Sequence, residues 1–372
     1  MTHTFLMAGG GTGGHVVPAL AVARELRLRG HQPFFIGTRH GFEARLVPAQ
    51  GFPLEWIEIG GLKNVGLLRR LKTLWQLPNS VLRSLRIIRR RKPAAIFSMG
   101  GYVAAPPMIA AILARIPLVV MEPNAMAGFT SRLLGRFARK ALLTFDETRA
   151  AFPDGVCEMT GLPVRAEFFE IEPVKPRMPF RVFITGGSRG ARTLNRAVRD
   201  ALPLLAQSGL PVQLTVQCGA DALAELTAAF AQHQIAGEVK AFVDDMPQAV
   251  ADAALVIARA GAGSISELAA AGRPSILVPF PFAADDHQTK NAEALSRAGA
   301  AILVADAAMN GERLFAEVQS ACREPERLEQ MAIAARRLAR PGAAQRAASI
   351  LEELAGLTPQ RKAETIIRTN VF

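Results

Sequence analysis

The sequence predicts an α/β protein built from two doubly wound parallel-sheet domains with a cleft between them. Three observations lead to this fold class. Short apolar runs alternate with longer stretches of helical periodicity, which is typical of βαβ units. A proline-rich segment, 161–179, interrupts the pattern once, and the pattern then restarts with a new glycine-rich turn. The length of 372 residues is enough for two domains of ordinary size.

The first half of the chain contains five predicted strands. They are the apolar runs 4–8, 33–37, 94–99, 117–121 and 141–145. The first of them leads into a glycine-rich turn, 9–14, and then into a stretch of helical spacing that begins near Val16. The intervening stretches are predicted helices, because their apolar residues recur with the helical period.

The second half repeats this order after the proline-rich linker. The predicted strands are 181–185, 212–216, 239–243, 254–258 and 275–278, separated by alanine-rich helical stretches. Ligands of doubly wound sheets bind at the carboxyl ends of the strands, so the cleft between two such domains is the expected active site. The tail 358–372 is polar and basic.

Composition and cysteine content narrow the class of protein. Half of the residues are hydrophobic and a fifth are charged, which excludes a disordered chain. Cys157, Cys218 and Cys322 lie far apart, as expected in a reducing cytosol. The first apolar run is too short for a signal peptide, and Arg115 and Pro117 interrupt the most apolar later stretch. We therefore expect a protein that is neither secreted nor membrane-spanning.

The positive charge is concentrated in one segment. Residues 61–92 contain ten Lys and Arg and no acid, whereas the whole chain has a net charge of +12. Such a segment indicates an anionic partner surface, either nucleic acid or anionic lipid; a solvated helix face is the alternative. Trp75 is its one aromatic residue, so it lacks the stacking platform of a nucleic-acid binder.

Within this segment one apolar stripe is the predicted membrane face. Its members follow helical spacing and are flanked by basic residues: Leu67, Leu68, Leu71, Leu74 and Trp75, with Arg69, Arg70 and Lys72. Pro78 is expected to end this helix. A second stripe, Val81, Leu82, Leu85 and Ile88, leads directly into a strand and is assigned to the core.

The turn 9–14 matches the pattern GxGxxG through Gly9, Gly11 and Gly14. A dinucleotide site would also require an acid at the end of the second strand, and residues 35–39 contain none. The turn therefore indicates an oxyanion site at a helix N-terminus. His15 follows it, and is either a helix cap or a general base.

Two further glycine turns follow predicted strands, at 98–101 and 186–190. In the latter, Ser188 either caps a helix or donates to a phosphate. Three turns suited to anions suggest that both reactants carry phosphate groups.

The segment 259–267 has two interpretations. Ser264 and Glu267 have the spacing of a capping box, whereas Glu267 at a strand's carboxyl end could instead accept the hydroxyls of a ribose. Gln288 offers an amide to sugar hydroxyls. The chain has no DxD pattern and no clustered His or Cys, so no metal site is expected.

Taken in order, six motifs resemble the signature of the MurG family of bacterial peptidoglycan glycosyltransferases. They are GGTGGH (10–15), SMGGYV (98–103), GLPVR (161–165), GGSRGA (186–191), RAGAGSISE (259–267) and the HQ…NA stretch (287–292). The resemblance covers about residues 4–340. It implies the GT-B fold of two Rossmann-like domains, 1–162 for acceptor and membrane and 163–340 for the UDP-sugar. It also implies a last helix, 341–357, that returns to the first domain.

The resemblance assigns roles to individual residues. His15 is the implied base, and Gly100, Gly101 and Tyr102 are candidates for the acceptor's diphosphate. The implied donor-binding residues are Thr12, Gly13, Gly14, Asn124, Arg165, Ser188, Val243, Glu267 and Gln288. One departure stands out: where the family commonly has His-Glu-Gln-Asn, this chain has Met121, Glu122, Pro123 and Asn124.

The expected activity is inverting, metal-independent transfer of N-acetylglucosamine from UDP-N-acetylglucosamine to the muramyl 4-hydroxyl of undecaprenyl-diphosphate lipid I. The products are lipid II and UDP, no cofactor is required, and the enzyme would act on the cytoplasmic face of the bacterial inner membrane. The alternatives are another GT-B UDP-sugar transferase, a UDP-sugar epimerase, or a basic nucleotide-dependent binding protein.

Overall fold

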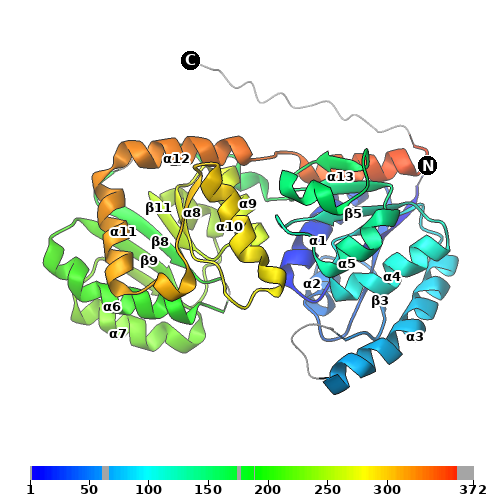
Figure 1. Ribbon diagram of the computed structural model, residues 1–372, viewed down its shortest axis with the longest axis horizontal. Coiled ribbons are helices and arrows are strands. Elements are labelled where there is room, and N and C mark those ends of the chain that lie inside the picture. Colours follow the sequence, from blue (N-terminus) through cyan, green and yellow to red (C-terminus); the bar gives the residue numbers. More distant parts are fainter. Residues whose placement is uncertain (1, 61–66, 174–176, 188, 358–372) are drawn as a thin grey trace, which may run out of the picture.

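The computed structural model describes residues 2–60, 67–173, 177–187 and 189–357, of which residues 67–74 are described as helix only. Two α/β lobes lie side by side, with helices α12 (Pro325–Leu338) and α13 (Ala343–Leu354) running along the same side of both (Figure 1). The expected α/β class with two doubly wound sheets is confirmed.

The N-terminal lobe is built on a parallel sheet of order β3-β2-β1-β4-β5-β6-β7. Its strands are β1 Thr4–Ala8, β2 Gln32–Gly37, β3 Leu54–Trp56, β4 Ala95–Ser98, β5 Leu118–Glu122, β6 Lys140–Leu143 and β7 Cys157–Met159. The two three-residue strands, β3 and β7, form the edges of this sheet. Strands β3 and β7 were not predicted, because three residues are too few to show a period.

The C-terminal lobe repeats this topology with the order β10-β9-β8-β11-β12-β13. Its strands are β8 Phe180–Thr185, β9 Val212–Gln217, β10 Gly237–Lys240, β11 Leu255–Ala258, β12 Ser275–Leu277 and β13 Ala301–Leu303. Strand β13 was also missed, and β10 begins and ends earlier than the predicted run 239–243. The central strands are buried on both faces, which explains their continuous apolar sequences.

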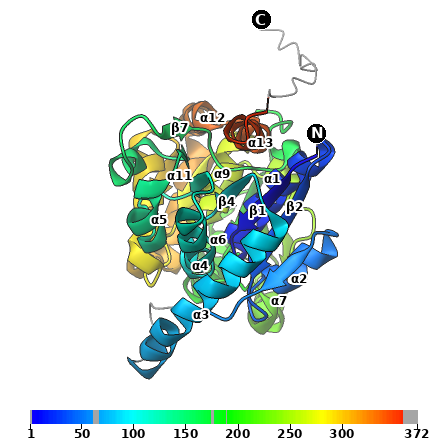
Figure 2. The ribbon, with the colours of Figure 1, turned by 90° about the vertical axis from the view of Figure 1, so that its right-hand side faces the viewer.

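Helices cover both faces of each sheet (Figures 1 and 2). In the N-terminal lobe they are α1 Gly13–Leu28, α2 Glu43–Ala49, α3 Leu67–Arg91, α4 Gly101–Leu113 and α5 Phe129–Leu134. In the C-terminal lobe they are α6 Arg192–Ser208, α7 Leu223–Gln232, α8 Met246–Asp252, α9 Ala262–Ala271, α10 His287–Arg297 and α11 Gly311–Arg323, followed by α12.

The strand order reverses once in each sheet, between β1 and β4 and between β8 and β11. At such a switch point the loops after the two central strands diverge and leave a crevice for ligands. The glycine turns after β1 and β4 therefore lie together in one lobe, and those after β8 and β11 lie together in the other.

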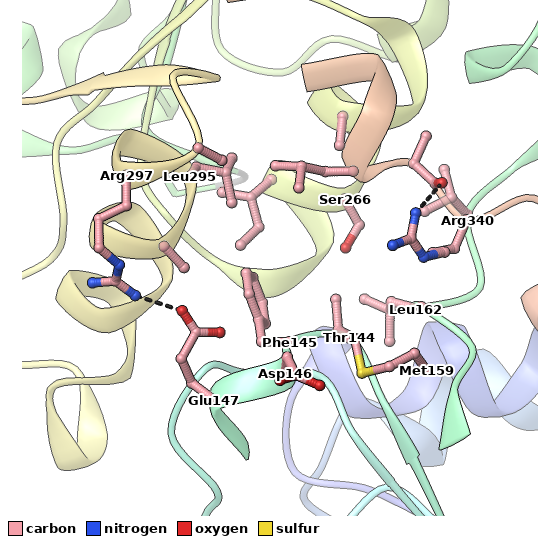
Figure 3. Close-up of a pocket in the computed structure, with 18 of the residues that line it drawn as sticks. Thr144, Phe145, Asp146, Glu147, Met159, Leu162, Ser266, Leu295, Arg297 and Arg340 are labelled. Carbon is pink, nitrogen blue, oxygen red and sulfur yellow. Dashed lines mark hydrogen bonds and ion pairs between the residues drawn. The ribbon is translucent and has the colours of Figure 1, made fainter. Parts of the chain in front are cut away.

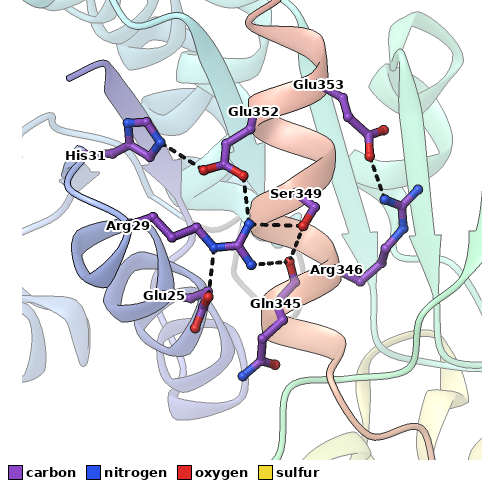
Figure 4. Close-up of polar contacts among 8 residues, drawn as sticks. All are labelled: Glu25, Arg29, His31, Gln345, Arg346, Ser349, Glu352 and Glu353. Carbon is purple, nitrogen blue, oxygen red and sulfur yellow. Dashed lines mark hydrogen bonds and ion pairs between the residues drawn. The ribbon is translucent and has the colours of Figure 1, made fainter. Parts of the chain in front are cut away.

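Helix α13 returns to the N-terminal lobe and packs against α1. Ala347, Ile350 and Leu351 are fully buried there in one core with Phe5 and Leu26. A polar cluster flanks this contact: Glu352 binds Arg29 at 2.7 Å and His31 at 3.0 Å, and Arg29 also binds Glu25 at 2.7 Å (Figure 4).

The expectation that Pro78 ends its helix is wrong. Helix α3 runs without a break from Leu67 to Arg91, with Pro78 inside it, and its N-terminal end projects beyond the rest of the lobe (Figure 2). Pro78 lies on the exposed side, where water can solvate the carbonyl that its missing N–H leaves unpaired. The second stripe also differs from the prediction, since Val81, Ile87 and Ile88 are buried whereas Leu82 is 50% exposed.

Candidate active site

A cavity of about 890 Å³ lies between the two lobes. Its volume is in the upper part of the range of small-molecule sites, roughly 300–1,000 Å³. Both switch points contribute to its walls. Of the predicted site residues, eight line it: Thr12, Gly13, Gly14, His15, Gly101, Tyr102, Asn124 and Glu267.

Helices α1, α4 and α9 are among those that begin at this cavity. None of them has an acidic residue in its first turn. Their N-terminal amides and dipoles therefore present partial positive charge to the cavity, an arrangement that suits phosphate or another oxyanion.

His15 lies in the first turn of α1, where its ring faces the turn after β4. Its Nδ1 lies 3.3 Å from the carbonyl oxygen of Gly10 and 3.3 Å from Oγ1 of Thr12. A Cβ at Gly101 would lie only 3.1 Å from Cε1 of His15, so the close approach of the two turns requires glycine there. Burial lowers the pKa of His15, and nearby His287 lowers it further. The neutral ring, which can accept a proton, is therefore favoured.

Glu122 and Asn124, which line the cavity, form a polar junction with Asn291. Glu122 is 2% exposed and accepts hydrogen bonds from the backbone amide and side-chain amide of Asn124, both at 3.2 Å. Burial raises the pKa of Glu122. Asn291 donates to Oδ1 of Asn124 at 3.2 Å and accepts from the amide of Ala125 at 2.8 Å. Asn291, on α10, thereby joins the two lobes.

The two residues that depart from the family pattern, Met121 and Pro123, lie in different surroundings. Met121 is fully buried in strand β5, within the core, whereas Pro123 lines the cavity beside Asn124.

The capping-box interpretation of Ser264 and Glu267 is wrong. The N-cap of α9 is Gly261, so Ser264 already lies inside the helix and cannot cap it. Glu267 instead lines the cavity, with Oε1 at 3.7 Å from Nη2 of Arg165. Burial raises the pKa of Glu267 to about 7, although the Arg165 guanidinium acts in the opposite direction.

The other predicted donor and acceptor residues that the structure describes are not in the lining of the cavity. Arg165 reaches it through Glu267, and Gly100 caps the start of α4. Gln288 uses Oε1 to accept the amide of Phe280 at 2.9 Å, and Val243 is 6% exposed within the core of the C-terminal lobe. Ser188 lies outside the described residues.

Two buried residues of this region were not predicted: Asn291 and Glu43. Glu43 is the first residue of α2, and its carboxylate accepts the amide of Gly11 at 2.7 Å beneath the turn 9–14. Glu43 lies four residues beyond the stretch 35–39, where a dinucleotide site would have its acid. The signal was the two glycines that precede it, Gly37 at the end of β2 and Gly41 in the loop that follows.

A second cavity of about 360 Å³ lies on the other side of α9 (Figure 3). Arg297 and Glu147, joined by an ion pair, flank one side of it, and Arg340 flanks the other. Its walls are mainly apolar and include both segments that cross between the lobes, at 161–164 and 338–340. None of the predicted site residues that the structure describes lines it. Among the described residues, no group of three or more His, Cys, Asp or Glu could hold a metal ion.

Comparison with known proteins identifies the family. Residues 5–143 match the glycosyltransferase family 28 N-terminal domain, and residues 181–354 match the C-terminal domain of the same family. The chain belongs to glycosyltransferase family 28.

The similarity to individual family 28 proteins extends along almost the whole chain. A Solibacter usitatus protein, 57% identical over 95% of this chain and 96% of its own, is named UDP-N-acetylglucosamine--N-acetylmuramyl-(pentapeptide) pyrophosphoryl-undecaprenol N-acetylglucosamine transferase. A Methylococcus capsulatus protein of the same name is 43% identical over 96% of this chain and all of its own. The crystal structure of Acinetobacter baumannii MurG superposes with a TM-score of 0.81 at 32% identity, covering 94% of this chain and 99% of that one. The expected membership of the MurG-type GT-B enzymes is confirmed.

Proposed function

We propose that this protein transfers N-acetylglucosamine from UDP-N-acetylglucosamine to the 4-hydroxyl of the muramyl sugar of lipid I, forming lipid II and UDP in peptidoglycan synthesis. The near full-length similarity to transferases of that name supports the reaction. The observation that carries the proposal for this chain is the shared cavity, which has His15 on one wall and Glu267 on the other.

In the proposed reaction the acceptor hydroxyl attacks the anomeric carbon from the face opposite UDP, which inverts the configuration. His15, as a neutral imidazole, takes the hydroxyl proton as the new glycosidic bond forms. The bond to UDP breaks, and negative charge grows on the leaving diphosphate. Helix N-termini at the switch points stabilise that charge. Glu267 holds the donor's ribose, and Asn124 contacts the transferred sugar.

The direct test is product analysis with UDP-N-acetylglucosamine and a short-chain lipid I analogue. A disaccharide product together with UDP supports the proposal. Release of UDP-N-acetylmannosamine, or of UDP without a disaccharide, would contradict it.

We expect the Glu267→Ala variant to lose about 1.5–3 kcal/mol of donor binding, the value of hydrogen bonds to a charged group. The donor KM then rises about 10- to 150-fold. The melting temperature changes little, because the ion pair with Arg165 leaves the two side chains 44% and 30% exposed. Steady-state kinetics over donor concentration measures the effect.

The same residue predicts a pH dependence. Because the pKa of Glu267 is raised to about 7, its carboxylate becomes protonated as the pH falls through 7 and then accepts hydrogen bonds less well. The donor KM should therefore rise as the pH is lowered from 8 to 6. In Glu267→Gln this dependence should disappear; if it persists there, it belongs to another group.

We also propose that α3 docks the enzyme on anionic lipid at the cytoplasmic face of the inner membrane, where a lipid-linked acceptor is available. Trp75 is 79% exposed and Leu82 is 50% exposed one heptad later, so both lie on the outward side of the helix. Arg83, Arg86 and Arg89 are also exposed. The side chains of the predicted stripe before Trp75 lie outside the described residues.

Two basic residues in the described part of segment 61–92 are already engaged. Arg90 and Arg91 both bind Glu55, at 2.7 and 2.8 Å, so they fix the end of α3 to strand β3. No helix in the described part of the chain is both long enough and apolar enough to cross a bilayer. The proposed contact is therefore at the membrane surface.

Reversing the charge of Arg69, Arg70 and Lys72 to Glu should abolish cosedimentation with phosphatidylglycerol vesicles. Each basic residue near an anionic leaflet contributes about 1 kcal/mol, and its reversal adds repulsion. Turnover of a soluble acceptor analogue should survive. The matched control reverses Arg323, Arg327 and Arg337, which are exposed on α11 and α12. Equal loss of vesicle binding in both variants would contradict a specific α3 surface.

A further inference from the structure

The carboxylate of Glu43 is enclosed beneath the glycine turn 9–14. It is fully buried, and three donors converge on it: the amide of Gly11 on Oε2 at 2.7 Å, and the amide and hydroxyl of Thr38 on Oε1 at 2.9 and 2.7 Å. The surrounding sequence leaves room for it. A Cβ at Gly10 or Gly41 would lie 2.7 or 2.0 Å from its carboxylate, and one at Gly37 would lie 2.5 Å from its Cγ.

A single peptide unit connects Glu43 to His15. The N–H that Glu43 accepts belongs to Gly11, and the C=O of the same peptide group is that of Gly10. Because the peptide is planar and trans, its N–H and C=O point in opposite directions. The N–H is directed at Glu43, and the carbonyl oxygen lies 3.3 Å from Nδ1 of His15.

This contact specifies the tautomer of the imidazole. A carbonyl oxygen only accepts hydrogen bonds, whereas the Thr12 hydroxyl at the same 3.3 Å can donate or accept, so a proton on Nδ1 is the arrangement that satisfies both neighbours. The lone pair of the neutral ring is then on Nε2, and Nε2 is the atom that takes up a proton.

We propose that Glu43 is a positioning residue for His15. By fixing the Gly10–Gly11 peptide, its carboxylate holds His15 in the Nδ1–H form and leaves Nε2 as the proton acceptor. Only one part of this inference rests on the proposed function, namely that Nε2 takes the proton of the acceptor hydroxyl. A charged acceptor on the N–H side of an amide also polarises the group, which makes its carbonyl a stronger acceptor.

A carboxylate suits this position in a way that its amide does not. All three partners of Glu43 are donors, and a carboxylate is acceptor-only. In Glu43→Gln, one amide orientation directs NH₂ at Gly11 and the other directs it at Thr38. Either orientation sets donor against donor and disturbs the enclosure.

Glu43 also affects the pKa of His15, because its charge is one of several groups that act on the ring. Burial and His287 lower the pKa of His15, whereas the Gly10 carbonyl and the charge of Glu43 raise it. Tyr102 also faces Glu43, and its pKa is raised by burial and by that charge. Removing the charge should therefore lower the pKa of His15 further.

The test is nitrogen NMR of the full-length protein with ¹⁵N-labelled histidine, because imidazole ¹⁵N shifts distinguish the two tautomers. The chain has six histidines, and the spectrum of His15→Gln identifies the signals of His15. In the wild type we expect the Nδ1–H form. In Glu43→Gln we expect a larger Nε2–H fraction, since Nδ1 can then accept from the Thr12 hydroxyl, and a lower pKa.

Activity supplies the second readout. In Glu43→Gln, kcat should fall about 10- to 100-fold, the usual cost of losing a partner that orients a reacting group. The acid limb of kcat/KM should move to lower pH. The control is Glu55→Gln, on β3 of the same lobe, whose partners are Arg90 and Arg91. It should leave the His15 signals and kcat unchanged.

An Nε2–H tautomer in the wild type would overturn the proposal, and this measurement does not depend on whether Glu43→Gln folds. A folded Glu43→Gln protein with unchanged His15 signals would overturn it as well. If the tautomer responds as expected but His15→Gln retains full kcat, the positioning role is supported, and the proposed role of His15 as base fails separately.

Discussion

Replacing His15 with Gln should lower kcat about 10²- to 10⁴-fold, the usual contribution of a general base. Gln is close to His in size and can still fill the space beside Gly101, but its amide cannot take a proton at neutral pH. The neutral form of His15, favoured by its lowered pKa, is the form that carries the expected effect. Single-turnover kinetics with donor and soluble acceptor measures it.

The affinity for UDP separates this effect from damage to the donor site. Titration calorimetry with UDP should give nearly the same affinity for His15→Gln as for the wild type, because the proposed role is exerted on the acceptor hydroxyl. His233→Gln, at the end of α7 and outside the cavity lining, is the matched control and should retain kcat. A kcat for His15→Gln within a few-fold of the wild type would assign the proton to another acceptor.

Removing the carboxylate of Glu352 should destabilise the N-terminal lobe by about 3–5 kcal/mol, the usual cost of breaking a buried ion pair. Arg29 and His31 have side chains only 11% and 6% exposed, and Glu352 joins both of them to α13. In Glu352→Ala the Arg29 charge loses one of its two carboxylate partners, and the buried His31 loses its contact with α13. The remaining partner is Glu25.

Denaturant unfolding followed by tryptophan fluorescence measures this loss. Both tryptophans, Trp56 and Trp75, lie in the N-terminal lobe, so their signal reports on that lobe. Glu353→Ala makes the same substitution one residue later on α13. Its pair with Arg346 is 41% and 40% exposed, so it should cost about 0–1 kcal/mol. Equal destabilisation by the two variants would show that helix α13, and not the buried cluster, is responsible.

The sequence determined the fold class and most of the strands, because a doubly wound sheet repeats one local pattern many times. Central strands such as β1 and β8 are buried on both faces and are therefore apolar without interruption. The edge strands β3 and β7 escaped prediction because sheet pairing, and not local sequence, makes them strands. The prediction that Pro78 ends its helix failed for a related reason. The free-energy cost of a proline inside a helix depends on whether water can reach the carbonyl that is left unpaired.

The sequence also identified the glycine turns and His15, because tight strand-to-helix turns require residue types that are visible in one dimension. What each side chain contacts was decided by the tertiary structure. Glu267 has the spacing of a capping box, but the register of α9 begins the helix at Ala262 and turns that carboxylate to the cavity. Glu43 and Asn291 contact segments 32 and 167 residues away. The Glu43 contact requires β1 and β2 to pair, and the Asn291 contact requires the two lobes to meet, so the sequence could mark these positions but could not name their partners.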